Sequence, residues 1–85
     1  MDQTLASKAA LEALMHVNTR IVNSTGPKDL PFWCVSSKPY LRAIADDNYG
    51  LEYPVMCVLY ALNNLTQWRG ADARRIKLQL NEAIK

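Results

Sequence analysis

Apolar residues recur at three- and four-residue steps between residues 4 and 24, which is the spacing of one helix face. This spacing predicts a long amphipathic α-helix. Asp2 or Thr4 is expected to cap its first turn. Gly26 and Pro27 are expected to end it, because glycine adopts a left-handed conformation and proline cannot continue a helix. The stripe consists of Leu11, Leu14, Met15, Asn18, Ile21 and Val22, of which only Asn18 is polar.

Residues 25–37 have no clear helical period, and we expect a loop there. Pro27 and Pro31 argue against a long helix. The short apolar run 32–35 has no second strand to pair with. The predicted loop places the aromatic residues of this run, including Trp33, over the core.

A short helix is expected next, capped by Ser36 and Ser37 and carrying Pro39 in its first turn. It is expected to end near Asn48 or Gly50. Its apolar side consists of Tyr40, Leu41, Ile44 and Ala45.

A third helix is predicted from Pro54 to about Gln67 or Trp68. It is apolar on most sides, which is typical of a central helix. Gly70 then breaks the chain, and we expect a positive φ angle at this glycine. The apolar residues of this helix are Val55, Met56, Cys57, Val58, Leu59, Tyr60, Leu62 and Leu65.

The last helix is predicted over residues 71–84, with Asp72 in its first turn, where a negative charge suits the helix dipole. Its buried residues are expected to be Ala73, Ile76, Leu80 and Ala83 or Ile84. The four patterns together predict an all-α protein, a compact bundle of about four helices that forms a single domain over residues 1–85.

Composition agrees with a folded globular chain. The 85 residues are 49% hydrophobic and 21% charged, and a chain of this length forms one domain. The most apolar stretch, residues 55–62, is too short to span a bilayer, and the first residues do not resemble a signal peptide. We therefore expect a cytoplasmic protein that does not enter a membrane, with Cys34 and Cys57 reduced.

No residue pattern typical of an enzyme, metal or cofactor site is present. His16, the one histidine, falls at the edge of the first apolar stripe. Cys34 and Cys57 lack the local pairing of structural zinc sites. Asp46 and Asp47 are adjacent, whereas a calcium loop needs alternating ligands and a distal glutamate. The sequence therefore predicts a non-enzymatic protein without a metal or cofactor.

The net charge of +2 gives no strong argument for nucleic acid. The cations do gather around the predicted turn at Gly70, within the outline of a helix-turn-helix. Such a helix would present Arg74 and Arg75 near its start, where bases are contacted. Asp72 would face phosphate, however, and the preceding helix is too long. Binding of DNA or RNA by the last helix is the alternative interpretation.

Two tryptophans and four tyrosines are many large rings for so small a domain. Rings left on the surface would anchor a protein partner, because Trp, Tyr and Arg dominate interface energetics. The broad apolar surface of the third helix also favours a homodimer. We therefore expect a protein partner, bound by Trp33, Tyr60, Trp68, Arg69, Arg74, Arg75 and Lys77.

Four segments resemble a family of small uncharacterised proteins from bacteriophages and bacterial mobile elements. The segments are Lys-Pro-Tyr-Leu at 38–41, Asp-Asn-Tyr-Gly at 47–50, Leu-Tyr-Ala-Leu-Asn-Asn at 59–64 and Trp-Arg-Gly-Ala-Asp-Ala-Arg-Arg-Ile-Lys at 68–77. The resemblance covers roughly residues 38–80 and implies no catalytic residue. It implies a phage-type product in the host cytoplasm that binds a host or viral protein, for example as an inhibitor or in an anti-defence role.

Overall fold

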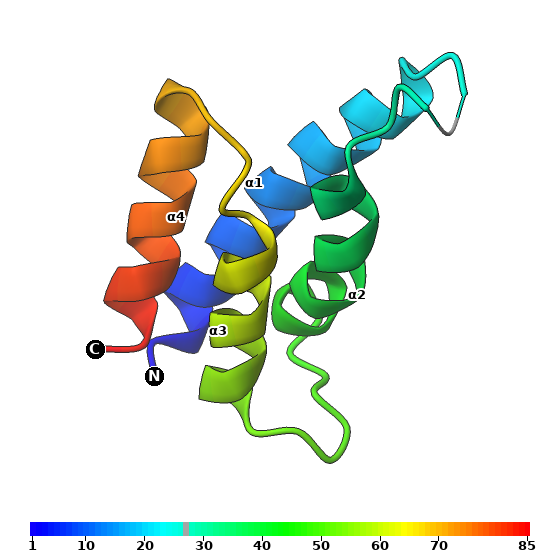
Figure 1. Cartoon of the computed structure of the whole chain (residues 1–85). Coiled ribbons are helices and arrows are strands. Elements are labelled where there is room, and N and C mark those ends of the chain that lie inside the picture. The colour runs from blue at the N-terminus through cyan, green and yellow to red at the C-terminus, as the bar shows by residue number, and fades with distance from the viewer. Residues whose placement is uncertain (27) are drawn as a thin grey trace.

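The computed structural model describes residues 1–26 and 28–85. Four α-helices make up its regular structure, and no strand occurs within these ranges (Figure 1). The prediction of a small all-α bundle is confirmed. The helices are α1 (Gln3–Val22), α2 (Phe32–Ala45), α3 (Pro54–Asn64) and α4 (Ala71–Ala83).

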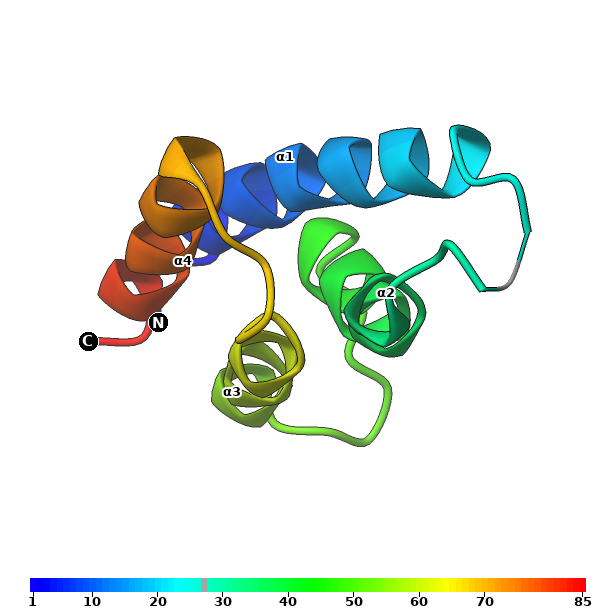
Figure 2. The same cartoon turned by 45° about the horizontal axis from the view of Figure 1, so that its top comes forward.

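The helices pack around α1, which is the longest of the four. Both α2 and α4 pack against α1, and α3 packs mainly against α2, with a lesser contact to α4 (Figure 2). The backbone N–H of Asp2 donates to the carbonyl of Ala83 at 2.7 Å, so the two chain ends lie side by side. The outer face of α3 is left without a neighbouring helix. The prediction that α3 is central is therefore wrong, because α3 packs against α2 and, to a lesser extent, α4, and no helix of the described residues covers its second apolar side.

Small side chains on α1 bring the neighbouring helices close. Four alanines at three- and four-residue steps are fully buried, and a methyl group there leaves room for the side chains of α2 and α4. The large core residues come mainly from α2, from α4 and from the residue that follows α3, and burying each contributes about 1.5–3 kcal/mol. The alanines are Ala6, Ala9, Ala10 and Ala13, and the largest buried side chains are Leu41, Ile44, Leu65, Ile76 and Leu80.

The first turn of α1 is capped as the sequence predicted, but its end is different. The Asp2 carboxylate accepts a hydrogen bond from the backbone N–H of Leu5 at 3.1 Å. The helix ends at Val22, and Asn23 closes it in a right-handed conformation. Gly26 therefore does not cap this helix. The predicted role of Pro27 lies outside the described residues.

The loop predicted over residues 25–37 is wrong in its second half, because α2 already begins at Phe32. Pro31 directly precedes the first helical residue, a position where its fixed φ and missing N–H cause no loss. Pro39 lies inside the helix and removes one hydrogen bond to the carbonyl of Val35. Val35 and Pro39 are both exposed, so water can satisfy that carbonyl.

The two serines predicted to cap α2 lie in its middle. Ser37 is fully buried, and the hydroxyls of Ser36 and Ser37 are both buried without a hydrogen-bond partner among the described residues. The end of α2 at Ala45 comes earlier than expected and is followed by two positive φ angles, 50° at Asp47 and 62° at Gly50.

The turn between α3 and α4 is longer than the sequence indicated. α3 ends at Asn64, and the backbone N–H of Trp68 donates to the carbonyl of Leu65 at 3.0 Å within the turn. Gly70 has a φ of 119° and directly precedes α4. The predicted positive φ is confirmed. This turn carries Trp68 and Arg69 into the region where candidate binding residues gather.

Candidate functional site

Two tryptophans 35 positions apart in the sequence stack on each other. Trp33 lies in the first turn of α2 and Trp68 in the turn before α4; their ring centroids are 5.5 Å apart, with an interplanar angle of 19°. The ring of His16, from α1, lies against Trp68 at 5.4 Å. Trp68 is only 9% exposed, so it belongs to the core, whereas Trp33 is partly exposed.

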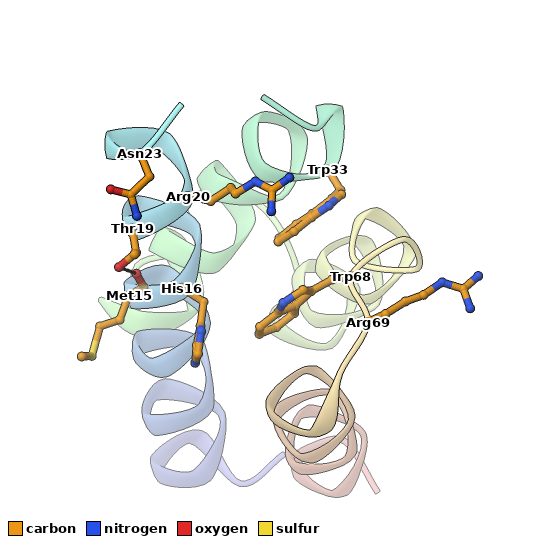
Figure 3. A pocket seen from close by; sticks show the side chains of 8 residues that line it. All are labelled: Met15, His16, Thr19, Arg20, Asn23, Trp33, Trp68 and Arg69. Atoms are coloured by element: carbon orange, nitrogen blue, oxygen red, sulfur yellow. Dashed lines mark hydrogen bonds between the residues drawn. The ribbon is translucent and has the colours of Figure 1, made fainter. Parts of the chain in front are cut away.

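A cleft of about 520 Å³ opens between α1 and the two rings, and we call it the tryptophan cleft (Figure 3). One wall is α1 from Met15 onwards together with Asn23, which follows the helix, and the other consists of Trp33, Trp68 and Arg69. The Arg20 side chain extends from α1 towards Trp33, whereas Arg69 extends away from the rings. The volume lies within the range of small-ligand sites, which is about 300–1,000 Å³.

A second cleft, of about 410 Å³, shares Trp68 and Arg69 with the first. Its other lining residues are Thr66, Gly70, Arg74 and Lys77. Cationic side chains therefore line both clefts, Arg20 and Arg69 in the first and Arg69, Arg74 and Lys77 in the second.

Arg75 is engaged within the protein. Its guanidinium donates to the Glu12 carboxylate at 2.7 Å and lies 3.5 Å from the Asp72 carboxylate. The hydrogen bond from Arg75 is the main cause that lowers the pKa of Glu12 below its ordinary value. The same hydrogen bond raises the pKa of Arg75. This pair joins α4 to α1, so Arg75 has a structural contact in addition to its predicted binding role.

Lys77 is also engaged within the protein. Its Nζ donates to the backbone carbonyl of Trp68 at 2.7 Å and to that of Leu65 at 3.2 Å. A cation suits these carbonyls, which lie just after the end of α3. Lys77 therefore holds the turn that carries Trp68. Arg69 and Arg74 are exposed and form no salt bridge within residues 1–26 and 28–85.

Tyr60 lies apart from the tryptophans, on the outer face of α3. Its ring packs near that of Tyr40, with centroids 5.5 Å apart. α3 contains no charged residue. We define the α3 face as Val55, Met56, Leu59 and Tyr60, whose exposed fractions are 39%, 37%, 39% and 36%.

The thiols and the histidine form no ligand cluster with the acids. Burial raises the pKa of both the Cys34 and the Cys57 thiols. His16 Nε2 lies 3.8 Å from the Asp72 carboxylate. Across the described part of the chain, no group of three His, Cys, Asp or Glu side chains could hold a metal ion. No helix described there is both long enough and apolar enough to cross a membrane.

The structure joins three of the predicted partner-binding residues, Trp33, Trp68 and Arg69, in one cleft. Sequence reasoning missed Arg20 and treated His16 as an edge residue. The sequence does indicate that His16 and Arg20 lie together, because residues four positions apart share one face of a helix. Only the fold shows that this face lies opposite the tryptophans.

Comparison of the chain with protein-family models, with curated proteins and with solved structures finds no match.

Proposed function

We propose that this protein is a small non-enzymatic interaction protein that binds another protein chain through the α3 face. The observation that carries the proposal is the chemistry of this helix. Four large apolar side chains are each more than a third exposed, on a helix without a single charge. An exposed apolar patch of this kind is typical of a protein–protein interface.

Residues next to the α3 face extend the apolar surface. Tyr53, which precedes the helix, is 78% exposed, and Leu51 is fully exposed. Tyrosine and methionine are enriched in the buried centres of interfaces, where charged residues are depleted. The patch therefore matches the centre of an interface better than it matches an ordinary solvated surface.

A second copy of this chain is the occupant that fits the α3 face best. Two copies that met through α3 would bring together no charged residue of this helix, and apolar side chains would cover apolar side chains. Small domains also gain stability from oligomerisation, since their own core is limited. α3 has 11 residues and is about 16 Å long. We expect a small interface and a dimer of micromolar affinity.

Sedimentation equilibrium tests this pairing. The wild-type chain should approach twice the monomer mass as its concentration rises through the micromolar range. Val55→Glu and Leu59→Glu place a charge in the apolar contact and should each give a monomer with unchanged helical content. Leu78→Glu is the matched control, because Leu78 is 61% exposed and belongs to a different helix, α4. A wild-type chain that stays monomeric would rule out the second copy.

A host or viral protein is the other partner, which the resemblance to phage proteins favours. Capture from nuclease-treated bacterial lysate with the same variants distinguishes it. A protein held by the wild type and by Leu78→Glu, but lost with both charged α3 variants, would make that protein the occupant. If the wild type is monomeric and no captured protein depends on Val55 and Leu59, the proposed function is wrong.

Binding of nucleic acid by the first turns of α4, the alternative interpretation, has less support from the contacts. Arg75 is paired with Glu12, and Lys77 donates to two carbonyls. If Arg74, Arg75 and Lys77 held nucleic acid, the last two would have to give up these internal partners. Arg69 and Arg74, which form no salt bridge with a described residue, line a cleft together with Trp68.

A further inference from the structure

The tryptophan cleft combines aromatic surface with cations that have no acidic partner. Arg20 is exposed on α1 and extends towards Trp33 (Figure 3). Arg69 and Arg74 follow on the other side of Trp68. None of these three arginines forms a salt bridge with any described residue. The cleft shares no residue with the α3 face, so it is a separate surface.

Tryptophan rings next to these arginines suit a ligand that is both planar and anionic. Nucleic-acid bases stack on aromatic side chains irrespective of sequence, and a groove of cations tracks the phosphates. Arginine suits phosphate because its planar fork can donate two parallel hydrogen bonds to it. The volume of about 520 Å³ is that of a small-ligand site. A nucleoside phosphate has both chemical features.

The position of the cations indicates how the phosphates are presented. Arg20 and Arg69 both line the tryptophan cleft, but Arg20 extends towards Trp33 and Arg69 extends away from the rings (Figure 3). Arg69 also lines the second cleft, together with Arg74. One mononucleotide would engage a single side, whereas a strand has a phosphate on either side of each base. We propose that the tryptophan cleft binds nucleoside phosphates, presented as single-stranded nucleic acid, with a base against Trp33 and backbone phosphates on Arg20 and Arg69.

One acid lies beside the cleft. The Asp72 carboxylate is 3.8 Å from His16, but it also lies 3.5 Å from the Arg75 guanidinium. Arg75 also pairs with Glu12 at 2.7 Å, so it offsets the charge of the two carboxylates only in part. Three exposed arginines, Arg20, Arg69 and Arg74, stand against the remaining negative charge.

Intrinsic fluorescence tests the proposal directly, because the chain has two tryptophans and both line the cleft. Titration with a short oligothymidylate at low salt should quench this fluorescence to saturation. AMP, inorganic phosphate and a glutamate-rich peptide of equal charge are the comparison probes. We expect the oligonucleotide to bind at least tenfold more tightly than AMP, since it engages both sides of the cleft.

Variants then identify the contacts. Arg20→Ala and Arg69→Ala should each weaken oligonucleotide binding by about fivefold or more and lower the log–log salt slope by about 0.7. Arg42→Ala is the matched control, because Arg42 is exposed on α2 outside the cleft. It should leave affinity and slope unchanged, and circular dichroism checks the fold of every variant.

Other results would change the ligand or overturn the proposal. AMP could instead quench the fluorescence to saturation with the same affinity as the oligonucleotide, in a way that depends on Arg20. The cleft would then bind nucleoside phosphates as proposed, but the ligand would be a free nucleotide. If the oligonucleotide gives no quenching, or if the Arg20→Ala/Arg69→Ala double variant binds it unchanged, the proposal is overturned. Equal binding of the acidic peptide also overturns it, because the cleft would then recognise negative charge without a base.

Discussion

The Lys77 side chain is expected to stabilise the fold through the turn that carries Trp68. Its Nζ donates to the carbonyls of Trp68 and Leu65 at 2.7 Å and 3.2 Å. Lys77→Met keeps the aliphatic stem and removes both hydrogen bonds. A hydrogen bond to a charged group contributes about 1.5–3 kcal/mol when well shielded. Lys77 is only partly buried, and solvent reduces the two contributions to about 1–2 kcal/mol in total.

Urea denaturation followed by circular dichroism measures the loss in the free energy of unfolding. Thermal denaturation followed by the same signal gives the melting temperature. Since 1 kcal/mol shifts the melting temperature of a domain of this size by about 4–8 °C, we expect Lys77→Met to melt about 5–15 °C below the wild type. Arg74→Met is the matched control on the same helix. Arg74 is exposed and makes no hydrogen bond to a described residue through its side chain, so its change should stay within about 0.5 kcal/mol. If both variants have the same midpoint, Lys77 does not hold the turn.

Three further predictions follow from single features of the fold. Gly70→Val should lower the free energy of unfolding by at least about 1 kcal/mol, because Gly70 has a φ of 119°, and an unchanged melting temperature would contradict this. Ser37→Ala should leave stability unchanged or raise it by up to about 1 kcal/mol, since the fully buried hydroxyl has no partner among the described residues; a clear loss in urea denaturation would show that it has one. Cys34 and Cys57 should resist a thiol reagent at pH 8 until urea unfolds the chain, because burial raises the pKa of both thiols, and rapid labelling of the native protein would refute this.

The helical architecture could be predicted because it depends on local patterns. The apolar period located α1 and α4 to within a residue or two at most ends, and Pro54 marked the start of α3. Gly70 could be assigned a positive φ because a chain reversal there leaves few other residues acceptable. These inferences need only neighbouring residues.

The start of α2 could not be predicted, because proline can either end a helix or precede its first turn. In the sequence, Pro31 is interpreted as a helix breaker, and Pro39 as a residue of the first helical turn. Pro31 in fact precedes the first turn, and Pro39 lies on an exposed side, where one missing hydrogen bond is tolerated. The side of the helix that a proline occupies depends on the rest of the fold.

The candidate site could be predicted only in part for a related reason. Residue types marked Trp33, Trp68 and Arg69 as binding residues, and the structure brings these three together. The same reasoning could not show that Arg75 contacts Glu12, 63 positions away in the sequence. A cation's partner is set by tertiary packing, which charge patterns along the chain do not contain.

Site-specific photo-crosslinking tests the central claim, that the α3 face contacts another protein chain. A photoreactive benzoylphenylalanine would replace Leu59 in one variant and Leu78, on the exposed side of α4, in another. Illumination in intact cells should give a discrete crosslinked product from position 59, either a dimer of this chain or a conjugate with one other protein. Position 78 should give none. No product from position 59, or the same products from both positions, would contradict the account.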